Sequence, residues 1–263
     1  MKNIKIIVAA HKKYQMPQEK IYMPVQVGAE GKNSINGYVQ DNVGNNISIK
    51  NPYFCELTGL YWAWKNLDAD YIGLVHYRRY FTVAKKIPKN EDEKFKKILT
   101  SEEAEKKLEK ADVILPKLRN YYIENLYSHY AHTMYVEPLE ETRKIIEEKY
   151  PEYLEEFDKL HKRTSAHMFN MFIMKKEILN DYCKWLFDIL FELENRTDVS
   201  KYDSFHARFY GRISELLLDV WINKNQIKYE EVKVMDMQNV NWLKKGMSFL
   251  NAKFTGKKYK KSF

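Results

Sequence analysis

One histidine and two arginines follow a short apolar stretch within the sequence Tyr71–Phe81. We expect a strand here, and strand alternation would place His76 and Arg78 on one face and Tyr77 and Arg79 on the other. In open α/β sheets, ligands bind at the carboxyl ends of the strands. The stretch therefore predicts a site for an anionic ligand. Surface ion pairs between these arginines and carboxylates are the competing interpretation.

A second set of charged residues is spaced to share one side of a helix expected from about Ser204 to Asn223. Arg208, Arg212, Glu215 and Asp219 follow spacings of four, three and four residues, which stacks their side chains along that helix. A solvated stripe of ion pairs is the usual interpretation of this pattern.

The elements that would position these residues alternate between strands and helices. Aliphatic runs predict strands over Ile4–Ala10, 23–28 and 112–116, and Asn51-Pro52 is typical of a helix start. That helix is apolar through Trp64, so we expect its Glu56 to have a hydrogen-bonding or cationic partner. The pattern indicates one α/β core with additional helices.

Composition excludes several classes of protein. The 263 residues are 44% hydrophobic, which is too apolar for a disordered chain, and no stretch approaches the about 20 apolar residues of a membrane span. Cys55 and Cys183 lack metal or disulfide spacing, so we expect buried thiols in a reducing cytosol. We expect no signal peptide and a cytoplasmic protein.

Common catalytic signatures are absent, including the phosphate-binding loop, the dinucleotide fingerprint, the zinc-protease motif and the serine-esterase elbow. Asp68-Ala69-Asp70 resembles a metal-binding pair, but it precedes the strand at Ile72, whereas metal-binding acids follow theirs. We therefore expect turn residues there. Fixed cations at His76, Arg78 and Arg79 could neutralise a diphosphate in place of a metal. The predicted metal and cofactor are none, with Mn²⁺ or Mg²⁺ as the alternative.

Five segments resemble a family of bacterial proteins encoded among capsular and exopolysaccharide synthesis genes and regarded as glycosyltransferases. The resemblance spans about residues 4–235, and it rests on 41–48, 51 with 56–66, 73–80, 170–174 and 208–217. It implies a single GT-A-like (Rossmann-like) domain with a mixed central sheet, helices on both faces and a helical C-terminal extension. It also implies a nucleotide-sugar donor and an acceptor on a lipid-linked oligosaccharide.

With this resemblance, the candidate residues divide into three groups. We expect uridine diphosphate linked to a hexose, with galactose in pyranose or furanose form as the candidate sugar. The donor would contact His11, Tyr14, Gly28, Asp41, Glu56, His76, Arg78 and Arg79. The sugar and acceptor would contact His167, Asn170, Arg208 and Arg212. Glu215, on the same stripe as Arg208 and Arg212, is the first candidate for the base that deprotonates the acceptor hydroxyl, and Asp203 is the second.

The net charge of +8 is concentrated at the C-terminus, where the last 20 residues carry seven lysines and no acid. We expect a domain over 1–235 and a basic, aromatic tail over 236–263 that binds the anionic inner face of the plasma membrane. A frayed, solvated tail is the alternative. Nucleic acid is not expected, because no recognition motif accompanies the charge. A non-catalytic module that binds polysaccharide or membrane is the rival to the enzyme.

Overall fold

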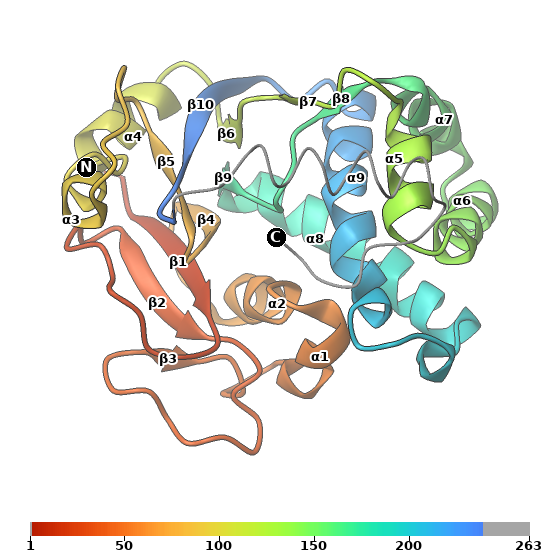
Figure 1. Cartoon of the computed structure of the whole chain (residues 1–263), viewed down its shortest axis with the longest axis horizontal. Coiled ribbons are helices and arrows are strands. Elements are labelled where there is room, and N and C mark those ends of the chain that lie inside the picture. Colours follow the sequence, from red (N-terminus) through yellow and green to blue (C-terminus); the bar gives the residue numbers. More distant parts are fainter. Residues whose placement is uncertain (1, 239–263) are drawn as a thin grey trace. The chain divides into compact units, whose positions relative to one another are not determined.

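Figure 1 shows the ribbon of the computed structural model, which describes residues 2–238. The described residues form two units, each built from segments that are far apart in the sequence. Unit 1 holds the described residues of Met1–Lys117, Phe169–Lys184 and Ile227–Asn239, and unit 2 holds those of Leu118–Met168 and Trp185–Gln226. No helix within 2–238 is long and apolar enough to cross a bilayer.

Unit 1 is built on a mixed sheet of eight strands with the order β3-β2-β1-β4-β5-β10-β6-β9. The pairs β1–β2, β1–β4 and β2–β3 are parallel, whereas β4 pairs antiparallel with β5 and with β9. The α/β class with a mixed central sheet is confirmed. The strands are β1 (Ile4–Ala10), β2 (Tyr22–Gln26), β3 (Val39–Gln40), β4 (Tyr71–His76), β5 (Arg79–Thr82), β6 (Val113–Pro116), β9 (Phe172–Lys175) and β10 (Tyr229–Asp236).

The chain reverses direction immediately after His76, so the single strand expected over Tyr71–Phe81 was wrong. β4 ends at His76 and β5 begins at Arg79, with His76 and Arg79 as paired residues of a hairpin. The reversal replaces the alternation that would have aligned His76 with Arg78. Beyond it, β5 continues antiparallel to β10, in which Asp236 pairs with Arg79.

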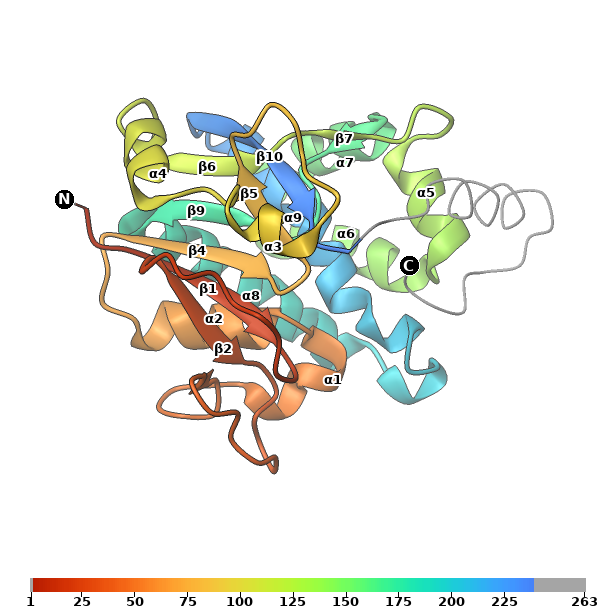
Figure 2. The ribbon, with the colours of Figure 1, turned by 60° about the vertical axis from the view of Figure 1, so that its left-hand side comes forward.

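Helices cover both faces of this sheet, as expected. Successive residues of β1 point to opposite faces. Ile6 joins a core with Ala104 and Leu108 of helix α4 (Ser101–Leu108), whereas Ile7 approaches Gly59 of α2 (Leu57–Asn66). Figure 2 shows α2 and α4 on opposite sides of the strands. The smaller helices of this unit are η1 (Ser48–Lys50), α1 (Asn51–Phe54) and α3 (Glu91–Phe95).

The helix expected from Asn51 through Trp64 is interrupted at Cys55. This residue has a φ of 53°, which lies in the left-handed region and ends α1 before α2 begins at Leu57. Non-glycine residues adopt this conformation only under constraint from surrounding contacts, so the break could not be predicted from local sequence. Cys183 is a buried free thiol as expected, whereas Cys55 is half-buried.

Unit 2 consists mainly of helices packed around α9, whose residues are almost all buried. α7 and η2 pack against α9, and α5 packs against α7. A two-stranded pairing of β7 with β8 completes the unit. Its elements are β7 (Arg119–Asn120), α5 (Leu126–Thr133), α6 (Glu137–Lys149), η2 (Pro151–Tyr153), α7 (Leu154–Lys162), β8 (Ser165–Ala166), the end of α8 (Lys176–Arg196), η3 (Val199–Lys201), η4 (His206–Arg208) and α9 (Phe209–Lys224).

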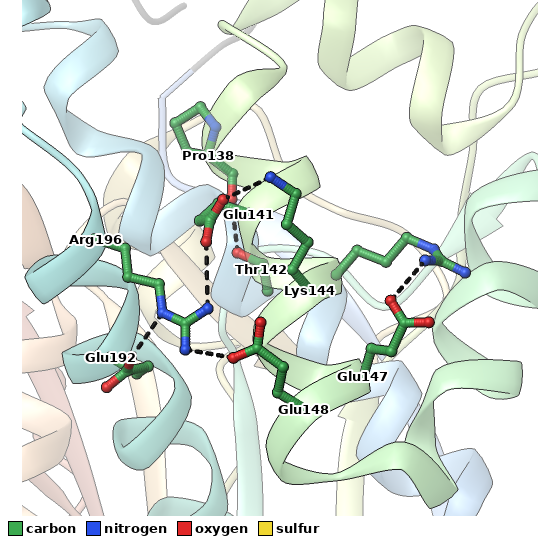
Figure 3. Close-up of polar contacts among 9 residues, drawn as sticks. Pro138, Glu141, Thr142, Lys144, Glu147, Glu148, Glu192 and Arg196 are labelled. Atoms are coloured by element: carbon green, nitrogen blue, oxygen red, sulfur yellow. Dashed lines mark hydrogen bonds and ion pairs between the residues drawn. The ribbon is translucent and has the colours of Figure 1, made fainter.

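One arginine joins α6 to α8 within unit 2. Arg196 donates from Nη2 to Glu148 (2.6 Å), from Nε to Glu192 (2.7 Å) and from Nη1 to Glu141 (3.4 Å). Figure 3 shows the guanidinium between these three carboxylates, with Lys144 also on Glu141. The geometry uses the planar donor fork of arginine, which lysine does not have.

Candidate functional site

The carboxyl ends of β1 and β4 form a topological switch point in unit 1. From β1 the chain proceeds outward to β2 and β3, and then it returns to place β4 on the opposite edge of β1. A crevice at such a point is where open α/β sheets bind their ligands. His11 follows β1 directly, and Tyr77 follows β4 directly. The sheet therefore brings these two strand ends together at the position that the sequence analysis assigned to a nucleotide.

Three rings gather at this switch point. The rings of Tyr14 and Tyr77 are stacked with centroids 3.8 Å apart, and His11 meets Tyr14 and Tyr77 edge-on at 5.8 and 5.5 Å. Tyr38 fixes this arrangement: its hydroxyl accepts from the Tyr14 N–H (2.9 Å) and donates to the Tyr14 carbonyl (3.2 Å). Tyr77 and Tyr38 were not among the predicted site residues. The place of Tyr77 beside His76 was the only sequence signal.

Asp41 and Gly28 support the loop behind this edge. The carboxylate of Asp41 is fully buried, and it accepts hydrogen bonds from the N–H groups of Gly28 (2.9 Å) and Ala29 (3.0 Å) and from the hydroxyls of Thr58 (2.6 Å) and Ser48. Gly28 has a φ of 62°, and a Cβ there would lie 2.4 Å from Asn51. Asp41 and Gly28, which were predicted to contact the nucleotide-sugar donor, thus contact other residues of the chain. They could affect a ligand only by setting the conformation of this loop.

His76, Arg79 and Phe169 form a second cluster in unit 1. The Nε2–H of His76 donates to the Phe169 carbonyl, and the Arg79 guanidinium lies 4.4 Å from the centre of the Phe169 ring. Nε of Arg79 is also 2.9 Å from Asp236. Arg78 is placed differently, with its guanidinium 5.3 Å from the centre of the Tyr77 ring at the switch point. Of the two arginines, Arg78 is therefore the one beside the stacked rings.

The segment before β9 is strained. Phe169 and Asn170 are consecutive non-glycine residues with positive φ, at 81° and 51°. Such conformations cost about 1–3 kcal/mol each and persist where surrounding contacts impose them, commonly at functional sites. Asn170 is buried, and its Nδ2 donates to Glu56 Oε1 at 2.7 Å. This bond confirms that Glu56 has a hydrogen-bonding partner, as expected. It also joins Asn170, which was expected to contact the sugar and acceptor, to Glu56, which was expected to contact the nucleotide-sugar donor.

In unit 2, Glu215 is a buried carboxylate with one paired oxygen. Its residue is 6% exposed, and Oε1 accepts from Nη1 of Arg212 at 3.3 Å. Oε2 is buried and has no hydrogen-bond partner among the described residues. A buried carboxylate oxygen without a partner costs free energy, so a ligand hydroxyl that donates to it would be favoured. This geometry suits the proton-accepting role expected for Glu215.

Asp203, the second candidate base, has a structural task. Its carboxylate accepts from the backbone N–H groups of Phe205 (2.9 Å) and His206 (3.0 Å) and lies 2.7 Å from Nδ1 of His206. These hydrogen bonds lower the pKa of Asp203, which weakens it as a base. Arg208, of the sugar-binding group, is exposed at the end of η4.

His167 lies in the interior of unit 2. Its Nδ1 and its backbone N–H both bind the carboxylate of Asp219, and both residues are almost fully buried. The pair ties the segment after β8 to α9. Asp219 is therefore an internal partner of His167, and the four charges that share the sequence stripe do not share one environment.

A cluster outside the predicted site residues surrounds Glu124. Its buried carboxylate binds Nδ1 of His129 (2.9 Å) and Nδ1 of His132 (2.7 Å), and the His129 ring packs on Tyr121 with centroids 3.9 Å apart. Burial lowers the pKa of His129 and raises the pKa of Tyr121 to about 12. The charges of Glu215 and Arg212 also act on Tyr121, so this cluster adjoins the candidate base. The tyrosines and histidines over 121–135 were the available signal.

Within residues 2–238, no group of three or more His, Cys, Asp and Glu side chains is placed to hold a metal ion. Asp68 and Asp70 lie before β4, as expected, and Asp70 accepts from the backbone N–H of Asn3 at 2.8 Å. The Asp-x-Asp sequence is thus part of a turn in this structure.

Residues 5–226 match a protein family that is described as a domain of unknown function, DUF4422. The chain belongs to this family. Its structure is also similar to the apo structure of the WbbM bifunctional glycosyltransferase, with a TM-score of 0.82 and 31% sequence identity. The similarity covers 90% of this chain and 46% of that one, so this DUF4422 protein spans about half the length of WbbM. No curated protein matches the chain.

Proposed function

We propose that this DUF4422 protein is a glycosyltransferase that moves a hexose from a uridine diphosphate sugar to a lipid-linked oligosaccharide of a surface polysaccharide. Galactose, in pyranose or furanose form, is the sugar that we propose. The observation that carries this proposal is the ring and cation cluster of His11, Tyr14, Tyr77 and Arg78 at the β1/β4 switch point. The likeness to a bifunctional glycosyltransferase supports it.

In this proposal, the stacked tyrosines bind the nucleotide and Arg78 binds the diphosphate. A guanidinium donates paired hydrogen bonds to phosphate oxygens and stabilises the negative charge that develops as the diphosphate leaves. His76 and Arg79 contact Phe169, and Glu56 accepts a hydrogen bond from Asn170, the next residue of the same segment. These residues position the strained segment before β9, next to which the sugar is expected to lie.

Glu215 is proposed as the base. Its Oε2, which has no hydrogen-bond partner among the described residues, would accept the proton of the acceptor hydroxyl. The hydroxyl oxygen of the acceptor then bonds to the anomeric carbon as the bond between that carbon and the diphosphate breaks. Arg212, bonded to Oε1, holds the carboxylate in place. Arg208 would bind the acceptor from the exposed end of η4.

The first test is calorimetry of the whole chain with uridine diphosphate, with and without EDTA. We expect binding that EDTA leaves unchanged, because protein cations do the work of a metal. Arg78→Ala should weaken the affinity by about 10- to 100-fold, from loss of one charge-assisted, bidentate contact. The matched control is Arg163→Ala, which replaces a half-buried arginine of unit 2.

Two results would contradict this site. Binding that EDTA abolishes and Mn²⁺ restores would replace the cation mechanism with a metal-dependent one. Binding of polysaccharide without any affinity for uridine diphosphate would favour the non-catalytic module.

We also propose a peripheral site of action at the inner face of the plasma membrane. The lysine-rich tail that motivates this lies outside the described residues except for 236–238. Replacing Lys257, Lys258, Lys260 and Lys261 by Gln should release the protein from vesicles of anionic lipid, because each basic residue contributes about 1 kcal/mol of attraction. Unchanged sedimentation with these vesicles would exclude the tail as the anchor.

A further inference from the structure

A pocket of about 390 Å³ lies within unit 2, among α5, α6 and α7. Figure 1 shows these three helices as the green group of the ribbon. The pocket has an apolar wall that includes Leu139 and Phe157, and Tyr127 lies at its exposed side. Its volume falls in the range of small-molecule sites. None of its lining residues belongs to the donor and acceptor groups proposed above.

The polar groups of this pocket are held in fixed positions. Arg143 donates from Nε and Nη2 to the two carboxylate oxygens of Asp158, both at 2.8 Å. The hydroxyl of Tyr127 donates to Glu140 at 2.9 Å, which fixes the tyrosine ring beside the opening. A ligand would therefore meet an ordered rim, at little cost in side-chain entropy.

The lining charges select a neutral ligand. Arg143 and Lys162 are balanced by Glu140 and Asp158, so the formal charge of the rim is zero. His161 adds no charge near neutral pH, because burial lowers its pKa. Anions such as a nucleoside diphosphate would gain no net attraction from this rim.

His161 supplies a hydrogen-bond acceptor that no residue within 2–238 uses. Its residue is 7% exposed, and Nδ1–H donates to the Phe157 carbonyl at 2.7 Å, so the neutral ring leaves a lone pair on Nε2. Nε2 is buried and has no hydrogen-bond partner among the described residues. A buried acceptor of this kind is stabilised when a ligand hydroxyl donates to it.

We propose that this pocket binds a neutral pyranose unit of a glycan. Such a ring has an apolar face that can stack on Tyr127. Its hydroxyls both donate and accept hydrogen bonds, so they can pair with the carboxylates, the cations and the His161 acceptor that line the pocket. Neutral charge, ring-sized volume and mixed hydrogen bonding agree on this class. The site is separate from the proposed donor site, and its binding does not depend on transferase activity.

The test is saturation-transfer NMR on the whole chain, with methyl β-D-galactopyranoside, lactose and glucuronate as probes. We expect transfer to the two neutral sugars, unaffected by saturating uridine diphosphate, and weaker binding of the anionic glucuronate. Tyr127→Ala and Glu140→Ala should each weaken binding of the neutral sugars by about tenfold or more. Tyr53→Ala is the matched control, since Tyr53 is 38% exposed and Tyr127 is 39% exposed.

Three outcomes would overturn the proposal. These are no saturation transfer to either neutral sugar, unchanged binding in both pocket variants, or displacement of the sugars by uridine diphosphate. Both substitutions replace exposed residues, so the variants should stay folded, and circular dichroism would verify this. Absence of transferase activity in the unmodified protein, with sugar binding present, would contradict the proposed function alone.

Discussion

At the scale of single residues, the structure separates two acids that the sequence made nearly equivalent. Glu215 has one buried oxygen without a partner among the described residues. Both oxygens of Asp203 instead bind the backbone N–H groups and the histidine ring of the loop that follows it. The lowered pKa of Asp203 adds to this difference. A general base needs an oxygen that the substrate hydroxyl can reach as a hydrogen-bond partner, and Oε2 of Glu215 provides one that no described residue occupies.

Glu215→Gln should therefore reduce kcat by about 100- to 10,000-fold, the usual contribution of a general base. The KM for the nucleotide sugar should stay nearly constant, because the donor residues lie on other elements. The measurement is steady-state transfer from uridine diphosphate galactose. Asp203→Asn should have a smaller effect, and the exposed Glu152→Gln should have none. A larger loss in Asp203→Asn than in Glu215→Gln would reverse the assignment.

At the scale of elements, the position of the donor edge depends on one loop that a buried carboxylate holds. Asp41 accepts from two backbone amides after β2, from Ser48 of η1 and from Thr58 of α2. It thereby connects the end of β2 with η1 and α2, which lie on either side of Glu56 in the sequence. Its contribution to stability comes from satisfying these four donors inside the protein, where each buried polar group left without a partner costs about 1–3 kcal/mol.

Asp41→Asn turns one acceptor oxygen into a donor that faces other donors. We expect the free energy of unfolding to fall by about 2–4 kcal/mol, as measured by urea denaturation. The exposed Asp181→Asn is the control, and it should change stability by less than about 0.5 kcal/mol. Equal stability of the two variants would show that the Asp41 network is dispensable.

At the scale of the whole molecule, the half-buried His129 and the buried His161 make stability depend on pH. Burial lowers the pKa of His129 and of His161 in the folded protein. As pH falls through the ordinary histidine value of about 6.5, the unfolded chain binds these protons first, which favours unfolding. The stabilising effect of keeping the rings neutral is thus present above that value and is lost as pH falls towards the lower, folded-state pKa values.

The free energy of unfolding should accordingly be smaller at about pH 5.5 than at about pH 7.5. His161→Gln keeps a donor for the Phe157 carbonyl and removes the titrating ring, so the difference between the two pH values should shrink. The exposed His11→Gln should leave the difference as it is. Urea denaturation of the three proteins at both pH values measures this, and an undiminished difference in His161→Gln would contradict the assignment.

Local pattern was enough to predict several elements and one contact. The strand Ile4–Ala10, the strand expected over 112–116 and the partner of Glu56 are confirmed, and they rest on aliphatic runs and on the cost of burying a charge. The family resemblance in the sequence implies a glycosyltransferase, and the likeness to WbbM supports that class.

Tertiary structure alone decided the hairpin after His76, the break at Cys55 and the left-handed Phe169 and Asn170. Long-range contacts impose these conformations on residues that do not prefer them, so short-range sequence carries no trace of them. The same reason explains why Tyr14 meets Tyr77 and why Glu215 and Asp203 differ. Strand order and burial set those environments, and neither can be read from spacing along the chain.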